Sequence, residues 1–192
     1  MKAPKNIAWY FLLLVVIAAL YRIIPGRPFG FAPQWAMAVF AGAVIKDRKW
    51  AFIMPVLSMF VSDLIYQLLY MRGLSDMPGF YGGQWQNYLL FTLLVFVGMA
   101  VKKLNIIQVG AASVAAPTLY FLLSNFLVWA SNGLTRGLNR PKTFDGLIAC
   151  YADGLPFYRM SIIATFIFSA ILFGSYFLIK NLQTGNANLR KA

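Results

Sequence analysis

The stretch PVLSMFVSDLIYQLLY, residues 55–70, lies inside an apolar run and yet carries a carboxylate at Asp63. The run extends from Trp50 to Tyr70, close to the roughly 20 residues that a transmembrane helix needs to cross about 30 Å of hydrocarbon. A charged carboxylate in hydrocarbon costs a few kcal/mol at least. We therefore expect Asp63 to face the interior of a helical bundle, where it pairs with a cation or stays protonated.

The composition of the whole chain is that of a membrane protein. Of its 192 residues, 60% are apolar and only 11% are charged, and long apolar runs recur along the sequence. The runs are continuous rather than alternating, which excludes a transmembrane barrel, and they lack the polar face of an interfacial helix. We predict an all-α integral membrane protein, a single transmembrane domain over residues 1–192 that forms a compact bundle of about six helices. The expected spans are residues 7–24, 34–45, 50–70, 87–101, 107–130 and 157–179, with a short loop helix at 143–152.

The basic residues set the expected orientation, because the cytoplasmic loops of membrane proteins collect Lys and Arg. With both termini cytoplasmic, ten of the 17 Lys and Arg residues fall on the inner side and seven on the outer side. We therefore predict a multi-pass protein of the cell (inner) membrane. The net charge of +12 then reflects topology and attraction to anionic lipid headgroups, and we expect no nucleic-acid partner.

Residue types that metal sites and catalysis commonly need are absent or single in the sequence. The chain has no His, and its five acidic residues are all Asp, which excludes His-ligated zinc and a Ser-His-Asp triad. Its one cysteine, Cys150, excludes an intrachain disulfide and CxxC redox chemistry. No GxxxxGK[ST] loop occurs, so any uphill transport draws its energy from an ion gradient or from other subunits. We expect no metal, no cofactor and no enzymatic activity.

Polar side chains within the expected spans gather toward the outer half of the membrane. In the third span, Asp63 and Gln67 are four residues apart, and so are Ser62 and Tyr66, which places adjoining rows in one polar stripe. Other spans carry polar and aromatic residues at the same expected depth. Such convergence favours a solute cavity open to the extracellular side. The candidate substrate-binding residues are Gln34, Asp63, Tyr66, Gln67, Asn125, Trp129, Tyr151, Tyr158 and Arg159.

Depth in the membrane makes Arg159 the expected partner of Asp63, since both belong to the outer level. A structural role is the alternative for these residues: they form an ion pair within the bundle, or Asp63 caps a broken helix. Trp129 has an alternative role as well, because aromatic belts place Trp at membrane interfaces without any ligand.

Three segments carry a resemblance to a known family. They are RPFGFAPQWAMAVFAGAVIKDRKWAFIMPVLSMFVSDLIY at residues 27–66, NFLVWA from Asn125, and GLIACYADGLPFYR at 146–159. These segments resemble an uncharacterised family of bacterial integral membrane transport proteins, and the resemblance extends over residues 27–174. That family is in turn distantly similar to the substrate-binding S components of energy-coupling factor (ECF) vitamin transporters, in size, number of helices and placement of the site.

The resemblance implies a membrane transport protein that captures a small vitamin-like or heterocyclic solute, as an S component does. A membrane coupling subunit and ATPase subunits would then come from other chains, and membrane lipids surround the helices. Two other classes stay open on the residues alone. One is a membrane-embedded enzyme that acts on a lipid or isoprenoid substrate with Asp63 or Asp153 as acid or base, and the other is a scaffold subunit without a ligand.

Overall fold

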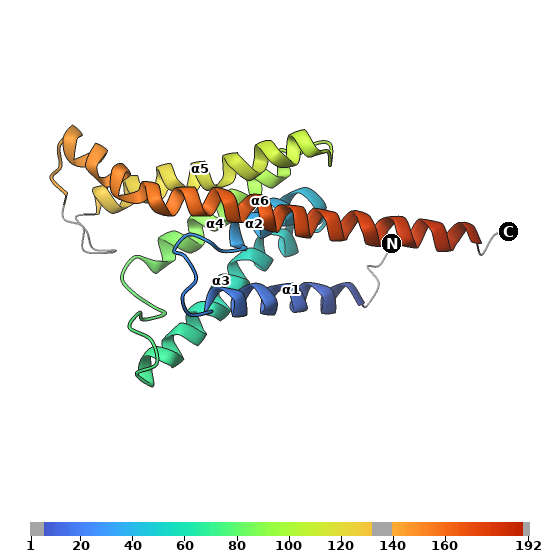
Figure 1. Ribbon diagram of the computed structural model, residues 1–192, viewed down its shortest axis with the longest axis horizontal. Helices are drawn as coiled ribbons and strands as arrows, with labels where there is room; N and C mark the ends of the chain where they lie inside the picture. Colours follow the sequence, from blue (N-terminus) through green and yellow to red (C-terminus); the bar gives the residue numbers. More distant parts are fainter. Residues whose placement is uncertain (1–5, 132–139, 190–192) are drawn as a thin grey trace.

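Six α-helices make up the part of the chain that the computed structural model describes, residues 6–131 and 140–189, and no strand occurs in those ranges (Figure 1). The predicted all-α class is therefore confirmed. The helices are α1 (Asn6–Arg22), α2 (Gln34–Val44), α3 (Arg48–Met71), α4 (Gln84–Met99), α5 (Ile106–Ala130) and α6 (Phe144–Leu189).

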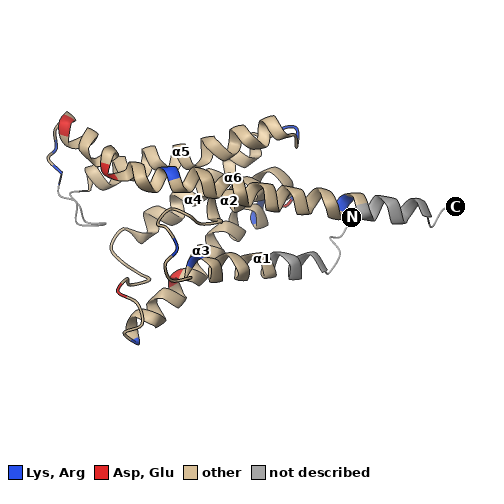
Figure 2. Cartoon of the chain, viewed as in Figure 1, with Lys and Arg blue, Asp and Glu red and all other residues tan. Residues whose placement is uncertain are grey.

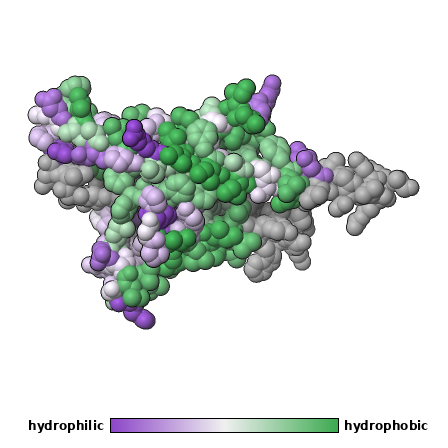
Figure 3. All heavy atoms as spheres, in the orientation of Figure 1, coloured by the Kyte–Doolittle hydropathy of each residue, from purple (hydrophilic) through white to green (hydrophobic). Residues whose placement is uncertain are grey.

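Within the described ranges, three helices are long and apolar enough to cross a membrane. They are α3, α5 and the part Phe144–Asn181 of α6, whereas α2 and Leu12–Arg22 of α1 are shorter apolar helices. Figure 3 shows hydrophobic residues over the middle of one face, with hydrophilic residues mainly toward the end where α5 ends and α6 begins. A broad apolar exterior of this kind is suited to lipid rather than to water, as expected of a membrane protein.

The short helix α2 lies inside the bundle, where it packs against α3, α4, α5 and α6. Every residue from Gln34 to Gly42 is buried, so no face of this part is exposed. A helix that is apolar all round is stable inside such a shell. Its small residues let neighbouring backbones approach. A Cβ atom on Gly42, or on Gly98 of α4, would lie less than 3.0 Å from a backbone oxygen of the other helix.

Residues 144–189 form one continuous helix, where the sequence predicts a loop helix at 143–152, a break and a separate span at 157–179. Pro156 lies inside α6 and does not end it. Contacts with α5 hold the helix on both sides of Pro156. Gly154 packs against the Asn125 side chain before it, and the Tyr158 hydroxyl forms a hydrogen bond with Thr118 after it. Neighbouring helices make proline tolerable within a membrane bundle, so the expected break does not occur.

Successive helices alternate in direction, so α1, α3 and α5 begin, and α2, α4 and α6 end, toward the same end of the bundle (Figure 1). The junctions at this end are basic. Lys46 lies between α2 and α3, Arg48 and Lys49 begin α3, and Lys102 and Lys103 lie between α4 and α5. Figure 2 shows basic residues at these junctions. One end of the bundle therefore carries a concentrated positive charge.

The close approach of α2 and α4 makes Gly42→Ala and Gly98→Ala destabilising, because the added methyl group meets a backbone oxygen of the facing helix. Overpacking of this kind costs about 1–3 kcal/mol, so we expect the Tm of the detergent-solubilised protein to fall by several degrees. Gly174→Ala is the matched control, since its added methyl group has no neighbour within 4 Å and Ala favours a helix over Gly. Equal Tm values for Gly42→Ala and Gly174→Ala would contradict this packing of α2 on α4.

Candidate functional site

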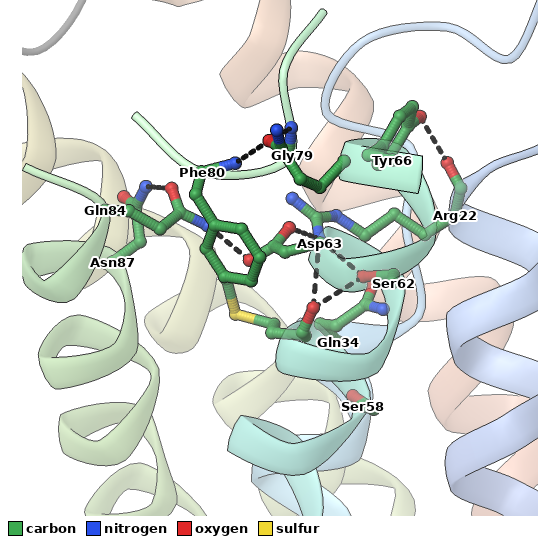
Figure 4. Close-up of polar contacts among 12 residues, drawn as sticks. Arg22, Gln34, Ser58, Ser62, Asp63, Tyr66, Gly79, Phe80, Gln84 and Asn87 are labelled. Carbon is green, nitrogen blue, oxygen red and sulfur yellow. Dashed lines mark hydrogen bonds and ion pairs between the residues drawn. The ribbon is translucent and has the colours of Figure 1, made fainter. Parts of the chain in front are cut away.

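The buried carboxylate of Asp63 is the centre of a polar network between helices (Figure 4). Asp63 comes from α3 and is 1% exposed. Its Oδ1 atom forms an ion pair with Arg22, which belongs to the last turn of α1. Its Oδ2 atom accepts hydrogen bonds from the Gln84 side chain and, at 2.8 Å, from the Tyr88 hydroxyl, both on α4. Three side chains from two neighbouring helices thus satisfy both carboxylate oxygens.

Arg22 is held by α3 as well as by the carboxylate. Its Nη1 atom donates to the Ser62 hydroxyl at 2.5 Å and to the Met59 carbonyl oxygen at 3.4 Å. The guanidinium carbon lies 5.8 Å from the centre of the Tyr66 ring, and the Tyr66 hydroxyl donates to the Arg22 carbonyl oxygen at 2.8 Å. A cation at the C-terminal end of a helix is also favoured by the helix dipole. These contacts join the end of α1 to α3.

The network continues from α4 to α5. The Asn87 amide donates to the Gln84 side-chain oxygen at 3.2 Å and to the Tyr81 hydroxyl at 2.5 Å. The side-chain oxygen of Asn87 accepts a hydrogen bond from the Tyr120 hydroxyl of α5 at 2.9 Å. One chain of hydrogen bonds therefore runs from α1 through α3 and α4 to α5. We call it the polar layer, and its members are Arg22, Ser62, Asp63, Gln84, Asn87, Tyr88 and Tyr120.

The loop between α3 and α4 lies over Asp63 (Figure 4). Gln67, one turn after Asp63, accepts hydrogen bonds from the backbone N–H groups of Gly79 and Phe80 at 3.1 and 3.2 Å. Gly79 lies directly on the backbone of α3, where a Cβ atom would be less than 3.0 Å from the Asp63 carbonyl oxygen. Gln67 therefore fixes this loop against the polar layer and is not free to bind elsewhere with its oxygen.

Two buried polar atoms in the first turn of α2 have no hydrogen-bond partner among the described residues: Oε1 of Gln34 and Nε1 of Trp35. Gln34 is 1% exposed, and its Nε2 atom donates to the Ala18 carbonyl oxygen of α1 at 3.3 Å. Trp35 is 9% exposed, and its ring packs edge-on against the Tyr120 ring of the polar layer at 5.6 Å. Buried polar groups without a partner are rare and cost about 1–3 kcal/mol each. These two atoms leave one acceptor and one donor of the site without a partner among the described residues.

The structure divides the nine candidate residues into two groups and one separate residue. Gln34, Asp63, Tyr66 and Gln67 lie in the polar layer or against it. Four others lie on α5 or α6, and Arg159 is exposed on α6. The single outer cavity that the sequence predicts for all nine residues is therefore not one cluster of side chains.

The α5–α6 hairpin contains the second group, and its members make their contacts within the hairpin. The Tyr151 hydroxyl donates to a backbone carbonyl oxygen of α5 at 2.9 Å, and the hydroxyls of Tyr158 and Thr118 share a hydrogen bond at 2.8 Å. The indole Nε1 of Trp129 donates to the Pro141 carbonyl oxygen at 2.9 Å. The two tyrosine bonds join α5 to α6, and the Trp129 bond joins α5 to the connection that precedes α6. The group consists of Asn125, Trp129, Tyr151 and Tyr158.

The expected pairing of Asp63 with Arg159 needs correction, because the cation beside Asp63 is Arg22. Depth along a helix follows from residue count, but the direction of a side chain depends on how the helices pack. The sequence analysis also missed Gln84 and Tyr88 as neighbours of Asp63. A signal for them exists, since these two polar residues are four apart and so lie on one face of α4.

A family model described as "Family of unknown function (DUF6580)" matches residues 2–187 of the chain. No curated protein and no solved structure matches. These comparisons thus contain no relative or structural neighbour that supports the similarity to ECF S components.

The network predicts strong energetic coupling between Asp63 and Arg22. Asp63→Asn keeps the shape of the side chain but removes its charge, which leaves a mostly buried guanidinium without its counter-ion. Breaking a buried pair costs about 3–5 kcal/mol, so we expect a low yield and a lowered Tm in detergent. Arg22→Gln should be similarly harmful, and the double variant Asp63→Asn/Arg22→Gln should be more stable than the sum of the two single losses predicts.

Arg159→Gln serves as the control in this double-mutant cycle, because Arg159 is exposed and does not contact Asp63. Its combination with Asp63→Asn should be additive. Additive losses for Asp63→Asn and Arg22→Gln would contradict the pairing, and so would a coupling to Arg159 as large as the coupling to Arg22.

Proposed function

Since the chain belongs to the family of unknown function DUF6580, we propose a function from its own site: a membrane transport protein that captures a small polar solute at the polar layer. In this role it acts as a substrate-binding subunit and not as an enzyme. The observation that carries the proposal is the pair of buried, unpartnered atoms on Gln34 and Trp35, next to a network built on a buried ion pair.

The buried charge of Asp63 supports a functional polar layer. Ionisable residues inside a membrane bundle are costly and rare, and in transport proteins they mark the paths of solutes and ions. Asp63 lies on α3, which is long enough to cross the membrane, and it is enclosed by the bundle. Stability alone does not require such a pair, because packed apolar residues in place of a buried ion pair are often equally or more stabilising.

The unpartnered atoms indicate the chemistry of the solute. Gln34 Oε1 accepts a hydrogen bond and Trp35 Nε1 donates one, so the solute should offer both a donor and an acceptor. The rings of Trp35, Phe91 and Tyr120 contact one another with centroids 5.1 to 5.6 Å apart and supply an apolar aromatic wall. A vitamin-like or heterocyclic compound with a flat ring and a polar edge has both features.

The membrane orientation that we propose follows from the charge at one end of the bundle. Loops rich in Lys and Arg stay in the cytoplasm. In the proposed orientation, the α2–α3 and α4–α5 junctions and both termini therefore lie on the cytoplasmic side of the cell (inner) membrane. All six helices then belong to the membrane domain, with α2 enclosed by its neighbours. The polar layer, at the end of α1 and the start of α2 and α4, lies toward the outside and receives the solute from there. Uphill uptake would require a coupling subunit and ATPase subunits from other chains, as in S components.

Mass spectrometry of the small molecules that copurify with the protein, followed by a thermal-shift screen of vitamins and nucleobase-like compounds, tests the proposal. We expect a water-soluble compound that raises the Tm. A broad screen without any stabilising compound, together with an extract that contains lipid alone, would contradict solute capture and favour a scaffold subunit.

Gln34→Met should separate solute binding from folding, because it keeps the volume of the side chain and removes the unpartnered oxygen. The change also removes the hydrogen bond from Nε2 to the Ala18 carbonyl oxygen. Without solute we expect a Tm close to that of the wild type, because the loss of this bond is offset by the loss of a buried acceptor that has no donor. The affinity for the solute should fall about tenfold, as expected for one lost hydrogen bond. Gln86→Met makes the same chemical change on α4 outside the polar layer. Solute affinity that is unchanged in Gln34→Met would remove Gln34 from the site.

A further inference from the structure

The polar residues around Asp63 are closed off from solvent. Their exposed fractions are 1% for Gln34, 0% for Ser62, 1% for Asp63 and 5% for Gln84. A polar solute does not pass between packed apolar helices, because its groups would leave water without gaining hydrogen-bond partners. A solute at the polar layer therefore needs an element at this end of the bundle that moves aside.

The α3–α4 loop, residues 72–83, covers the polar layer at Asp63 (Figure 4). Gly79 lies so close to α3 that a Cβ atom would be less than 3.0 Å from the Asp63 carbonyl oxygen. It is the one buried residue between 72 and 83, and the others are half-buried or exposed. Leu74, at 73%, and Met77, at 44%, are among the exposed ones. The loop therefore rests on the bundle mainly at Gly79 and its neighbours.

The Gln67 side chain of α3 holds the loop at this point. Its Oε1 atom accepts hydrogen bonds from the backbone N–H groups of Gly79 and Phe80 at 3.1 and 3.2 Å. The Phe80 ring also lies 5.9 Å from the Phe60 ring of the same helix. Two neutral hydrogen bonds shift an equilibrium by roughly tenfold to a hundredfold. Bonds of this strength keep a loop closed most of the time and still let it open.

A glycine with positive φ stands at each end of the loop. Gly73 follows the C-cap of α3 with a φ of 67°, and Gly83 is the N-cap of α4 with a φ of 83°. Glycine adopts such angles without strain, and hinges are commonly formed by residues at the ends of elements, which absorb changes in backbone angle. Gln84, directly after Gly83, donates to the carboxylate of Asp63. Movement of the loop about Gly83 therefore acts directly on the polar layer.

The α1–α2 loop, a second loop at this end, is fixed to two helices by aromatic rings. The Phe31 ring lies 5.8 Å from the Phe168 ring of α6 and 6.3 Å from the Tyr21 ring of α1. Gly30 lies on the backbone of α6, and Arg27 donates to the Phe31 carbonyl oxygen at 2.5 Å. Of the two loops, the α3–α4 loop is therefore the one that opens with less disruption of packing.

We propose that the α3–α4 loop is a lid on the polar layer, with Gln67 as its latch and Gly73 and Gly83 as its hinges. This role of the loop rests on the proposed function, the capture of a solute at that layer. Opening breaks the two hydrogen bonds to Gln67 and lifts Gly79 from the backbone of Asp63. Water and solute then reach the buried polar side chains from this end of the bundle.

Thiol labelling of purified, solute-free protein in neutral detergent tests the lid. Ser62→Cys in a Cys150→Ala background carries the chain's only thiol, at a buried position next to Asp63. Its rate of reaction with a water-soluble methanethiosulfonate measures how often the polar layer opens to water. We expect slow labelling with Gln67 in place and labelling about tenfold faster in Gln67→Met, which lacks the acceptor. Gln67→Glu keeps acceptor oxygens for the two N–H groups, so its labelling should stay slow.

Two further variants make the result independent of any one substitution. Gly79→Ala opens the lid by another route, because its methyl group has no room against the Asp63 carbonyl oxygen, and it should speed labelling as Gln67→Met does. Ser58→Cys, fully buried one turn before Ser62 on α3, replaces the reporter if Ser62→Cys folds poorly.

Ser113→Cys is the matched control for the reporter, because Ser113 is as buried as Ser62 but lies between α5 and α6, where it bonds to Ser169. Arg27→Gln is the matched control for the latch, since it releases the α1–α2 loop instead. Neither Ser113→Cys with Gln67→Met nor Ser62→Cys with Arg27→Gln should label faster. Equal acceleration at Ser113→Cys, or none at Ser62→Cys in Gln67→Met, would overturn the lid.

The labelling uses no solute, so its failure is distinct from failure of the proposed function. Acceleration by Arg27→Gln alone would move the entrance to the α1–α2 loop and leave solute capture intact. Acceleration by Gln67→Met, in a protein that no compound of the thermal-shift screen stabilises, would support the lid and contradict solute capture.

Discussion

The ion pair between Asp63 and Arg22 is the interaction on which the arrangement of the helices at this end of the bundle depends. A carboxylate within hydrocarbon is tolerable only where a cation and hydrogen-bond donors surround it, and these come from two other helices. The end of α1, the middle of α3 and the start of α4 must therefore meet at one point. Through Asn87 the same network reaches α5, so one charge specifies the relative positions of four helices.

Within the site, the residue that holds the helices together, Asp63, differs from the residues whose polar atoms have no partner, Gln34 and Trp35. A solute that bound Asp63 directly would have to displace Arg22, Gln84 or Tyr88 from the carboxylate. The unpartnered atoms of Gln34 and Trp35 take part in no hydrogen bond among the described residues. They lie on α2, the most enclosed helix, whose first turn contacts α1 through Gln34 and the aromatic residues of α4 and α5 through Trp35. Asp63 then acts by holding the surrounding helices in place.

Two loops pack against helices in the same way: in each, a glycine lies close to a backbone carbonyl oxygen of the helix. Gly79 places the α3–α4 loop on α3 at Asp63, and Gly30 places the α1–α2 loop on α6 at Phe157. Polar side chains add to each contact: Gln67 binds the first loop, and Arg27 binds the backbone of the second. The α3–α4 loop thus closes over the polar layer at Asp63, and the α1–α2 loop closes on α6 at Phe157.

Composition and periodicity determined the class of this protein, because the length of an apolar run and the absence of charge are properties of each segment by itself. They also required that Asp63 face the bundle interior and either pair with a cation or stay protonated, because an isolated carboxylate charge in hydrocarbon is too costly. They did not determine the partner. Arg22 and Arg159 lie at similar expected depths, and the choice between them depends on the rotation of α1 and α6 about their axes, which packing sets. Packing also kept α6 continuous past Pro156, and it left two polar atoms of α2 without hydrogen-bond partners. Such features join residues far apart in the chain, as the sequence separation of 41 between Arg22 and Asp63 illustrates, and no local pattern encodes them.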